Sequence, residues 1–416
     1  MMGLDDGRFL RGLDLSSRRR LVVAVSGGSD SLSLLLLTQS SLAAHAPDVA
    51  MFAVTVDHGL RPEAAAEAEA VAALCADRGI AHRTLVWRGD KPRTGVIAAA
   101  REARYGLLAQ AAEEFGSDVI LTGHTMDDQA ETVAMRARRG EGAGLAGMAA
   151  ATLFDEHVWI VRPLLGVRRE ALRRWLLERS VRWIEDPTNE NTAYERVRTR
   201  LSLASEGCVE DLAGRARQAG IARRKLSQDA ASLIRVYARM PVAGLFRMDA
   251  ALFGDGASDA AVLAVRALLA VAGGTPHLPD AARTRDVMRL LGQGPARVAL
   301  SRAIAERRKD TVWFRREARA VPDVSPTAAP FLWDGRWRIR CSAEHENVRI
   351  APLGSRLAAD HAPSVVSEPP SLVSAAFSLE PGVFDGADFI APAGSTANLP
   401  NGQTEWTLES GDVLTP

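Results

Sequence analysis

The sequence predicts an α/β fold, with a doubly wound and mostly parallel sheet in the first half, a helical domain after it and a small β-rich region at the end. Three observations carry this prediction. Short apolar runs alternate with helix-like segments up to about residue 200. Alternation of this kind is typical of βαβ units whose sheet is covered on both faces. Beyond that point the pattern becomes helical, and from about residue 311 it becomes strand-like.

The expected strands of the first half are short apolar runs, namely Leu21–Val25, Met51–Val56, Ala81–Val86, Asp118–Leu121 and Val158–Val161. Helical patterns lie between and after them, over Ser31–His45, Glu63–Arg78, Ile97–Phe115, Met126–Arg139 and Arg168–Arg179. Ligands of such sheets bind beyond the carboxyl ends of the strands. The loops that follow the strands are therefore where we expect the chemistry.

The second half contains no motif that carries chemistry. Its expected elements are helices over Val209–Arg239 and Asp259–Leu291, strands over Thr311–Phe314 and Val348–Ala351, and a hairpin over Phe331–Arg340 that turns at Asp334-Gly335. Residues 359–380 mix proline, serine and alanine and resemble a linker. We therefore expect a catalytic domain at 1–202, a helical domain at 203–305 and a β-rich region at 306–416.

The composition is that of an ordinary soluble globular protein, with 416 residues, a formal net charge of +0, 47% hydrophobic and 25% charged residues. Any nucleic acid would have to bind a locally positive surface. Cys75, Cys208 and Cys341 form no CxxC pair, which argues against a zinc site or an iron–sulfur cluster. No signal peptide or bilayer-spanning stretch is recognised, so we expect a cytoplasmic protein without a membrane partner. The sequence leaves the oligomeric state open, a homodimer included.

A glycine- and serine-rich turn follows the first expected strand and precedes an apolar helix. It consists of Ser26, Gly27, Gly28, Ser29, Asp30 and Ser31. The glycines allow the backbone to approach a ligand, and the amides at the helix start form an anion site. Asp30 is suited to holding Mg²⁺ against phosphate oxygens. The lysine of the GxxxxGK[ST] motif is missing. We therefore predict a phosphate-binding loop of another type, in preference to a merely serine-capped turn.

A second motif, GHTMDDQAET at 123–132, follows the fourth expected strand. Thr125 and Asp128 fit a capping box, which predicts that a helix begins near Met126. The motif thus repeats the strand–turn–helix arrangement of the first one. Because the carboxyl ends of parallel strands share one edge of the sheet, the two motifs are expected at the same edge.

Three side chains of the second motif, His124, Asp128 and Glu131, have the spacing i, i+4 and i+7 and are expected on one helix face. Such a set is suited to binding an ammonium group, ligating Mg²⁺ or taking a proton. Asp127 stands beside them, but an acid at a helix start also complements the helix dipole. For Asp127 the functional and structural interpretations both remain open.

Asp57 and His58 directly follow the second expected strand, in the sequence VDHGLR at 56–61. This position lies beside the expected nucleotide crevice. We therefore predict that Asp57 lines the site, and we leave the role of His58 open. Arg61, which precedes a proline, is equally consistent with a helix start signal.

A stretch rich in arginine extends from residue 136 to residue 200. Its members are Arg136, Arg138, Arg139, Arg162, Arg168, Arg169, Arg173, Arg174, Arg196, Arg198 and Arg200. Arginine suits phosphate contacts, so the cluster predicts a nucleic-acid footprint. The four that fall on the helix pattern over 168–179 are also consistent with a solvated face, whereas the alternating set from Arg196 to Arg200 is harder to explain in that way.

The turn at 26–31 resembles the PP-loop motif of the ATP pyrophosphatase family, whose members cleave ATP between the α- and β-phosphates and adenylate an oxygen. The ordered set of motifs over about residues 20–200 resembles the tRNA(Ile)-lysidine synthetase family. The set comprises SGGSDS at 26–31, VDHGLR at 56–61, AREARY at 100–105, GHTMDDQAET at 123–132, GLAGM at 144–148, RPLL at 162–165 and DPTN…RVR from 186 to 198. Each motif is weak to moderate alone, and the ordered set is specific.

This resemblance implies a reaction on the wobble cytidine, position 34, of the isoleucine tRNA with a CAU anticodon. ATP adenylates the base with release of pyrophosphate, and the ε-amine of free L-lysine then displaces AMP at C2 to form lysidine. The resemblance implies ATP and Mg²⁺ at Ser26–Ser31 with the metal on Asp30, and further nucleotide contacts by Asp57, Arg101 and Gly123. It implies His124, Asp128 and Glu131 at the reaction centre, and Arg196 near the reacting base or the adenylate. The family often has a second histidine where this chain has Thr125, so no role that needs two histidines is expected.

The resemblance also implies that the helical and β-rich regions grip the acceptor side of the tRNA. Two other enzyme classes remain alternatives. A PP-loop tRNA thiolase often needs paired cysteines, which are absent here, and a synthetase acting on a small acceptor would not explain the arginine-rich stretch or the long second half. A nucleotide-binding tRNA chaperone without turnover is the non-enzyme alternative. The acids Asp30, Asp128 and Glu131 speak against it.

Overall fold

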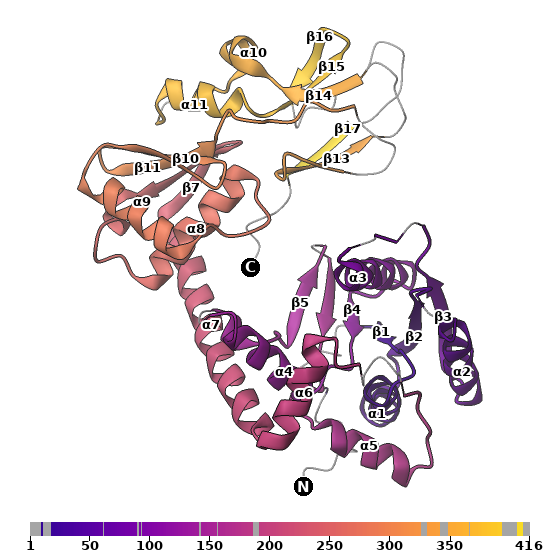
Figure 1. The fold of residues 1–416 in the computed structure, drawn as a ribbon. Coiled ribbons are helices and arrows are strands. Elements are labelled where there is room, and N and C mark those ends of the chain that lie inside the picture. Colours follow the sequence, from indigo (N-terminus) through magenta and orange to yellow (C-terminus); the bar gives the residue numbers. More distant parts are fainter. Residues whose placement is uncertain are drawn as a thin grey trace. The chain divides into compact units, whose positions relative to one another are not determined.

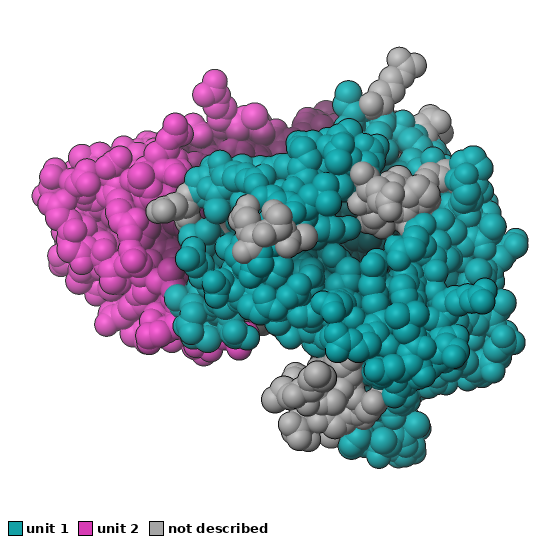
Figure 2. Space-filling model, turned by 60° about the horizontal axis from the view of Figure 1, so that its bottom comes forward, with its two compact units in different colours: residues 1–223 teal, residues 224–416 magenta. Residues whose placement is uncertain are grey.

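The computed structural model describes residue 10 and residues 18–60, 62–89, 91–92, 94–140, 143–155, 157–185, 191–325, 331–341, 348–365, 367–392 and 406–410. The chain forms two compact units, residues 1–223 and residues 224–416, which are coloured separately in Figure 2. Among the described residues, no helix combines the length and the apolar character needed to cross a bilayer.

The first unit is built on a six-stranded sheet with the strand order β3-β2-β1-β4-β6-β5 (Figure 1). The strands are β1 (Arg20–Ala24), β2 (Ala50–Asp57), β3 (Ala81–Val86), β4 (Val119–Leu121), β5 (Ala151–Phe154) and β6 (Val158–Val161). All neighbours pair in parallel except β5, which runs antiparallel to β6. The strands β1 and β4 are apolar almost throughout because both faces of a parallel sheet are covered.

The α-helices of the described part of this unit are α1 (Ser29–His45), α2 (Ala64–Asp77), α3 (Val96–Glu114), α4 (Met126–Ala137), α5 (Arg169–Glu178), α6 (Glu195–Glu206) and α7 (Val209–Tyr237), which continues beyond residue 223. A short 3₁₀ helix, η3 (Ala143–Ala146), follows α4. Alternate residues of β1 face opposite cores. Leu21 and Val23 pack with α1, α2 and α5, whereas Val22 packs with α3. The doubly wound, mostly parallel sheet predicted from the sequence is therefore confirmed.

The sequence patterns did not predict the strand β5 and the helix α6. The strand β5 is largely exposed at the sheet edge, so its residues form no buried apolar run. The helix α6 is rich in charge, and the arginines that alternate in the sequence lie on it. On a helix, Arg196 and Arg200 share one face while Arg198 points elsewhere. The three arginines therefore do not act from one common face, and a nucleic-acid role for them stays a prediction.

The second unit contains a five-stranded antiparallel sheet with the order β7-β8-β11-β10-β9. Its strands are β7 (Ala238–Val242), β8 (Leu245–Asp249), β9 (Arg297–Leu300), β10 (Ala303–Arg308) and β11 (Thr311–Arg316). One face packs against α8 (Asp259–Gly273) and α9 (Ala281–Gln293), with the 3₁₀ helix η5 (Ala250–Leu252) beside them. The other face packs against α11 (Pro370–Phe377).

Two three-stranded sheets complete the unit. They are β12 (Phe331–Trp333), β13 (Trp337–Cys341) and β17 (Trp406–Ser410), and β14 (Val348–Pro352), β15 (Pro381–Asp385) and β16 (Asp388–Pro392), and α10 (Gly354–His361) follows β14. The β12–β13 hairpin turns at Asp334 and Gly335, with φ of +53° and +70°. Positive φ at both central positions is what a tight hairpin turn requires, so the predicted hairpin is confirmed.

The expected domain limits in this half differ from the structure. The region expected to be helical, 203–305, also contributes strands to the five-stranded sheet, and the limit between 305 and 306 falls inside β10. The expected linker, 359–380, contains α11, whose Leu372 and Val373 are buried against the sheet. These features depend on pairing between distant segments, such as β8 with β11, which local patterns do not reveal.

A buried ion cluster stabilises the second unit at the β12–β13 turn. The side chain of Asp334 is fully buried and accepts hydrogen bonds from Arg316, at 3.0 Å from Nε and Nη2, and from Arg336 Nε at 2.9 Å. Arg302 pairs with the same carboxylate. Asp334 therefore pairs with three guanidinium groups, which come from β11 and from two turns, and Arg336 also pairs with the buried carboxylate of Glu380.

We expect Asp334→Asn to destabilise this unit by about 3–5 kcal/mol, because an amide of the same shape leaves buried guanidinium groups without their counter-charge. Urea unfolding followed by tryptophan fluorescence measures the change. Asp255→Asn is the control, since Asp255 pairs with Arg289 at the surface. Equal midpoints for the Asp334 variant and the wild type would contradict this account of the cluster.

Candidate active site

The loop between β1 and α1 has the geometry of an anion site. Gly27 has φ +83°, and a Cβ at this position would lie 2.6 Å from Ile184 Cδ1, so only glycine fits. Ser31 Oγ accepts a hydrogen bond from Ser26 N at 3.1 Å and donates to Gly28 O at 3.1 Å, which closes the turn. No side chain caps α1 at Gly28. The first amides of α1 therefore remain available to a ligand.

The helix α1 begins at Ser29, two residues before the expected start at Ser31. Ser29 and Asp30 thus belong to its first turn. The end of β4 approaches this turn closely, because a Cβ on Gly123 would lie 3.0 Å from the backbone of Asp30 and from Ser31 Cα. The absence of a side chain at Gly123 is what brings the first and second motifs together.

The second motif starts α4 as the sequence predicts. Asp128 Oδ2 accepts hydrogen bonds from Thr125 N at 2.8 Å and Thr125 Oγ1 at 2.9 Å, and Asp128 N donates to Thr125 Oγ1 at 3.4 Å. This confirms the capping box. Asp128 and Glu131 lie one turn apart on α4 and are buried. His124, however, precedes the N-cap residue, so the expectation that it shares their helix face is wrong.

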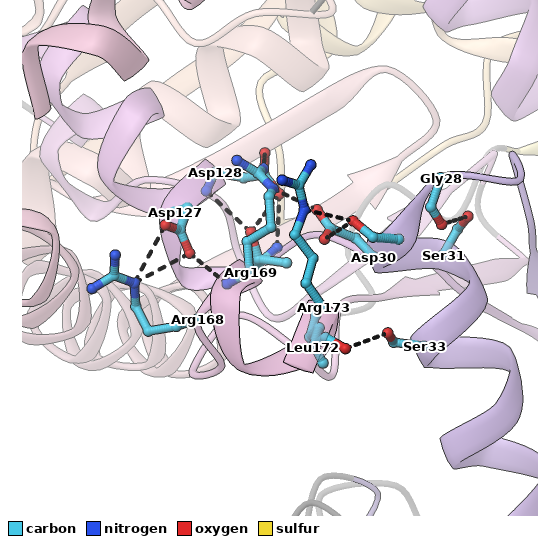
Figure 3. Close-up of polar contacts among 12 residues, drawn as sticks. Gly28, Asp30, Ser31, Ser33, Asp127, Asp128, Arg168, Arg169, Leu172 and Arg173 are labelled. Carbon is cyan, nitrogen blue, oxygen red and sulfur yellow. Dashed lines mark hydrogen bonds and ion pairs between the residues drawn. The ribbon is translucent and has the colours of Figure 1, made fainter. Parts of the chain in front are cut away.

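Arg169, at the start of α5, joins the two motifs (Figure 3). Its Nε donates to Asp30 Oδ2 at 2.8 Å and its Nη2 donates to Asp128 Oδ1 at 2.7 Å. Its Nη1 lies 3.5 Å from Glu131 Oε1. One guanidinium group therefore contacts all three acids that the sequence singled out.

Two arginines of α6 complete this cluster. Arg196 Nε donates to Glu131 Oε2 at 2.6 Å and Arg196 Nη2 donates to Asp128 Oδ1 at 2.9 Å. Arg200 Nε donates to Glu131 Oε1 at 2.7 Å. The structure thus places Arg196 with Asp128 and Glu131, as expected. We call Asp30, Asp128, Glu131, Arg169, Arg196 and Arg200 the acid–arginine cluster.

Burial and neighbouring charges together shift the pKa values of Asp30 and Asp128 in opposite directions. Burial raises the pKa of Asp30, although Arg169 opposes it. For Asp128, burial also raises the pKa, but the charges of Arg169 and Arg196 outweigh this and lower it below the usual value. Of these two aspartates, Asp30 is therefore the one whose negative charge is less compensated. A divalent cation beside it would supply the missing charge.

Asp127 has a structural role in this arrangement. Its Oδ2 accepts a hydrogen bond from the backbone N of Arg169 at 2.8 Å, and its carboxylate pairs with Arg168 Nε at 3.3 Å. It thereby satisfies an amide at the start of α5 and orients that helix. Of the two interpretations left open for Asp127, the structure favours the structural one.

His124 lies in a buried and positively charged environment. Its Nδ1 is 3.1 Å from Thr122 Oγ1. Burial is the main cause that lowers the pKa of His124 to about 3. The charges of Arg162, Arg104 and Arg101 act in the same direction, and Asp128 only partly opposes them. The imidazole is therefore neutral near pH 7 and is a weak base.

The other expected nucleotide contacts are not joined to the cluster. Asp57 ends β2 and accepts a hydrogen bond from Gly59 N at 2.7 Å, which closes a local turn. Arg101 is exposed on α3, with its guanidinium carbon 5.0 Å from the centroid of the Tyr105 ring. His58 Nδ1 is buried and has no hydrogen-bond partner among the described residues. Arg61 and residues 186–189 lie outside the described residues.

Most arginines of the expected footprint make contacts within the chain. Arg168 pairs with Asp127 and Glu210, and Arg198 donates to two carbonyl oxygens. Arg139, Arg173 and Arg174 pair with Glu195, Glu185 and Glu170. These contacts show that the arginines also join helices and loops within the chain, and the nucleic-acid footprint of the stretch stays a prediction.

The local sequence pattern does not reveal the central position of Arg169. Arg168 and Arg169 have the same local pattern, and their difference arises only from the direction in which α5 starts. The sequence holds only an indirect indication of the central role of Arg169. Three acids that lie together in a buried place require cationic partners. Arg200 was named only as part of the arginine-rich stretch, although its spacing of four from Arg196 places both on one helix face.

Comparison with known proteins agrees with this geometry. Residues 7–206 match the model of the PP-loop domain family. A tRNA(Ile)-lysidine synthase from Mesorhizobium japonicum is 49% identical over 369 residues, which cover 86% of this chain and 81% of the relative. The chain belongs to the tRNA(Ile)-lysidine synthase family. A second relative of that name, from Rhizobium meliloti, is 42% identical over 81% of this chain and 76% of its own length.

Among solved structures, the U34-tRNA thiolase NcsA from Methanococcus maripaludis is similar to this chain with a TM-score of 0.45 at 17% identity, over 53% of this chain and 78% of the thiolase. Membership of the tRNA(Ile)-lysidine synthase family makes the chain an ATP-binding enzyme of tRNA modification. The thiolase alternative is not favoured.

The donors of the loop are compatible with Mg²⁺, which commonly takes one or two carboxylates together with phosphate oxygens and water. Asp30 lies in the first turn of α1 beside the free amides, and Asp128 is close enough to raise its pKa. No group of three or more metal-binding side chains is found in the described part of the chain. The pair Asp30 and Asp128 therefore fits a metal shared with a nucleotide better than a metal held by protein alone.

We expect His124→Gln to flatten the dependence of stability on pH. The imidazole has an ordinary pKa of 6.5 when the chain is unfolded and about 3 when it is folded. Between these values the unfolded chain binds a proton that the folded chain does not, so the wild type loses stability as the pH falls through this window. The glutamine variant lacks this contribution, which amounts to about 2 kcal/mol at pH 5.

Urea unfolding of both proteins at pH 7.5 and pH 5 measures the difference. Parallel losses of stability in the wild type and the variant would contradict the buried, neutral state of His124.

Proposed function

We propose that this enzyme ligates free L-lysine to C2 of the wobble cytidine of the isoleucine tRNA with a CAU anticodon. The reaction proceeds by adenylation of the base with release of pyrophosphate, followed by displacement of AMP. The observation that carries the proposal is the convergence of Asp30, from the phosphate loop, with Asp128 and Glu131, from the second motif. Substrate phosphate and substrate amine would thus meet at one place.

The loop at 26–31 is proposed to bind the nucleotide. Two observations support this assignment: α1 has no side-chain cap at its start, and Gly27 has a positive φ. Both leave amides exposed to an anion. Asp30 would hold Mg²⁺, with Asp128 close by, and the metal would neutralise charge on the phosphate oxygens. Arg101 and Gly123 remain proposed nucleotide contacts. A nucleotide role for Asp57 remains proposed through its position at the end of β2, beside the crevice.

The acids of α4 are proposed to bind the ε-ammonium group of lysine. Asp128 and Glu131 already hold guanidinium groups, and an ammonium group would take the place of one of them. The amine must lose protons before it attacks C2. His124 is a weak base with a pKa of about 3. The pKa of Asp128 is also below its usual value, so basicity does not distinguish the two groups. We assign proton removal to the carboxylates because they would hold the ammonium group, and we give His124 an orienting role.

Arg196 is proposed to face the reacting base or its adenylate. It is half-exposed, with 40% of its side-chain surface accessible, while its nitrogens contact Asp128 and Glu131. When lysine occupies those acids, the guanidinium is free to stabilise charge on the phosphate. The second unit is proposed to bind the tRNA, and the cytoplasm, which contains ATP, lysine and tRNA, is the proposed location.

The proposal is tested by incubating the protein with ATP, radiolabelled lysine and total tRNA. We expect label to enter a single isoacceptor, the isoleucine tRNA with a CAU anticodon, and to depend on ATP. Label in no tRNA, or in many tRNAs, would overturn the proposed substrate.

We expect Asp128→Asn to reduce this transfer at least about 100-fold, because the amide cannot balance the ammonium charge or accept a proton. The variant retains the shape of the side chain and an oxygen for Thr125. Asp118→Asn is the matched control, because Asp118 pairs with Arg18 and lies before β4, at the edge of the sheet opposite the site. Unchanged transfer by a folded Asp128 variant would remove this residue from the reaction centre.

A further inference from the structure

Three arginines near the site have no carboxylate partner among the described residues. Arg101 and Arg104 lie in the first half of α3, and Arg162 directly follows β6. They contrast with Arg169, Arg196 and Arg200, which are all paired with acids. The carboxyl edge of the sheet thus has a balanced cluster on one side and an uncompensated positive cluster on the other.

Tyr105 lies between these arginines. The guanidinium carbons of Arg101 and Arg104 are 5.0 and 5.3 Å from the centroid of its ring. Tyr105 is 7% exposed, and its buried hydroxyl group lies close enough to Arg104 and Arg162 for hydrogen bonding to lower its pKa. It has no partner with the geometry of a full hydrogen bond among the described residues. The aromatic face stabilises the two cations in part, and no carboxylate among the described residues neutralises their charge.

Arg162 is also 7% exposed, and its guanidinium is held in place from one side only. Its Nη1 donates to Ala149 O at 2.9 Å and to Thr152 Oγ1 at 3.0 Å. Its buried Nε has no partner among the described residues. A buried guanidinium held by neutral oxygens alone is costly, because nothing balances its charge.

The neighbouring groups respond to this excess of positive charge. Burial raises the pKa of Tyr105, yet the charges of Arg104, Arg101 and Arg162 lower it below the usual value. Burial lowers the pKa of Arg104, and repulsion from Arg101 and Arg196 lowers it further. The three arginines around Tyr105 therefore favour the binding of an anionic group of a ligand.

The positive cluster adjoins the acid–arginine cluster. The charge of His124 is influenced by Asp128 on one side and by Arg162 and Arg104 on the other. The positive charge of Arg196 also lowers the pKa of Arg104, and Arg196 is itself hydrogen-bonded to Asp128 and Glu131. Carboxylates that can exchange a guanidinium group for a cation of the substrate thus lie next to a positive subsite. Such a pair is complementary to an amino acid that has an α-carboxylate at one end and a cationic group at the end of its side chain.

We propose that Arg104 and Arg162 bind the α-carboxylate of the amino-acid substrate while Asp128 and Glu131 bind its side-chain ammonium group. This inference rests on the proposed function. A carboxylate accepts paired hydrogen bonds from guanidinium groups, and it is small enough to reach Arg162, which is almost fully buried. The phosphates of the nucleotide have their own loop at 26–31. The positive subsite therefore selects free lysine over amines that lack the carboxylate.

The test compares L-lysine with L-lysinamide, in which a neutral amide replaces the carboxylate. The proposal expects the wild type to show a KM for lysinamide roughly 10- to 100-fold above that for lysine. Arg104→Gln should raise the KM for lysine by a similar factor, while the KM values for lysinamide, ATP and tRNA change little. Arg162→Gln should act in the same way. Thermal unfolding shows whether each variant is folded.

The matched control is Arg83→Gln, because Arg83 pairs with Glu114 at the far end of α3. Equal losses with lysine and lysinamide would overturn the proposal. A rise in the KM for ATP alone would assign the arginines to the nucleotide phosphates, and a rise in the KM for tRNA alone would assign them to the RNA backbone. If the wild type transferred neither amine to tRNA, the proposed function itself would fail, and the two failures are thereby distinguished.

Discussion

The geometry of this site depends on one interaction, the contact of the Arg169 guanidinium with carboxylates from two different motifs. Asp30 belongs to the first turn of α1, whereas Asp128 and Glu131 belong to α4. These carboxylates would repel one another in a buried place without a shared cation. Arg169 supplies that cation and also ties α5 to both motifs. A substrate that carries its own cation can therefore replace part of this arrangement without leaving the acids uncompensated.

The charged groups of the site are arranged so that each group of the proposed ligands can contact protein groups of complementary charge. The uncapped amides of α1 suit a phosphate, the acids of α4 suit an ammonium group, and the unpaired arginines beside Tyr105 suit a small anion. Most other arginines in the first unit are paired within the chain, which explains how a protein with a net charge of +0 contains strongly charged subsites. Glycine at positions 27 and 123 allows the backbone segments to come this close.

The sequence predicted the parts of the fold that depend on local signals. The strands of the parallel sheet, the capping box at Thr125 and the hairpin turn at Asp334-Gly335 all follow from short-range chemistry. It did not reveal β5, which is exposed at an edge, or α11, whose start at consecutive prolines resembles a linker. In the site, Asp128, Glu131 and Arg196 were foreseen as neighbours. The joining role of Arg169 was not, because it depends on where α5 begins in space.

The central claim is that the loop at 26–31 directs the α-phosphate of ATP toward a substrate oxygen. The most direct measurement supplies ATP labelled at the α- or the γ-phosphate, together with lysine and tRNA, and identifies the labelled products. This account predicts AMP and pyrophosphate in equal amounts with the lysine transferred. Release of ADP and orthophosphate would contradict it.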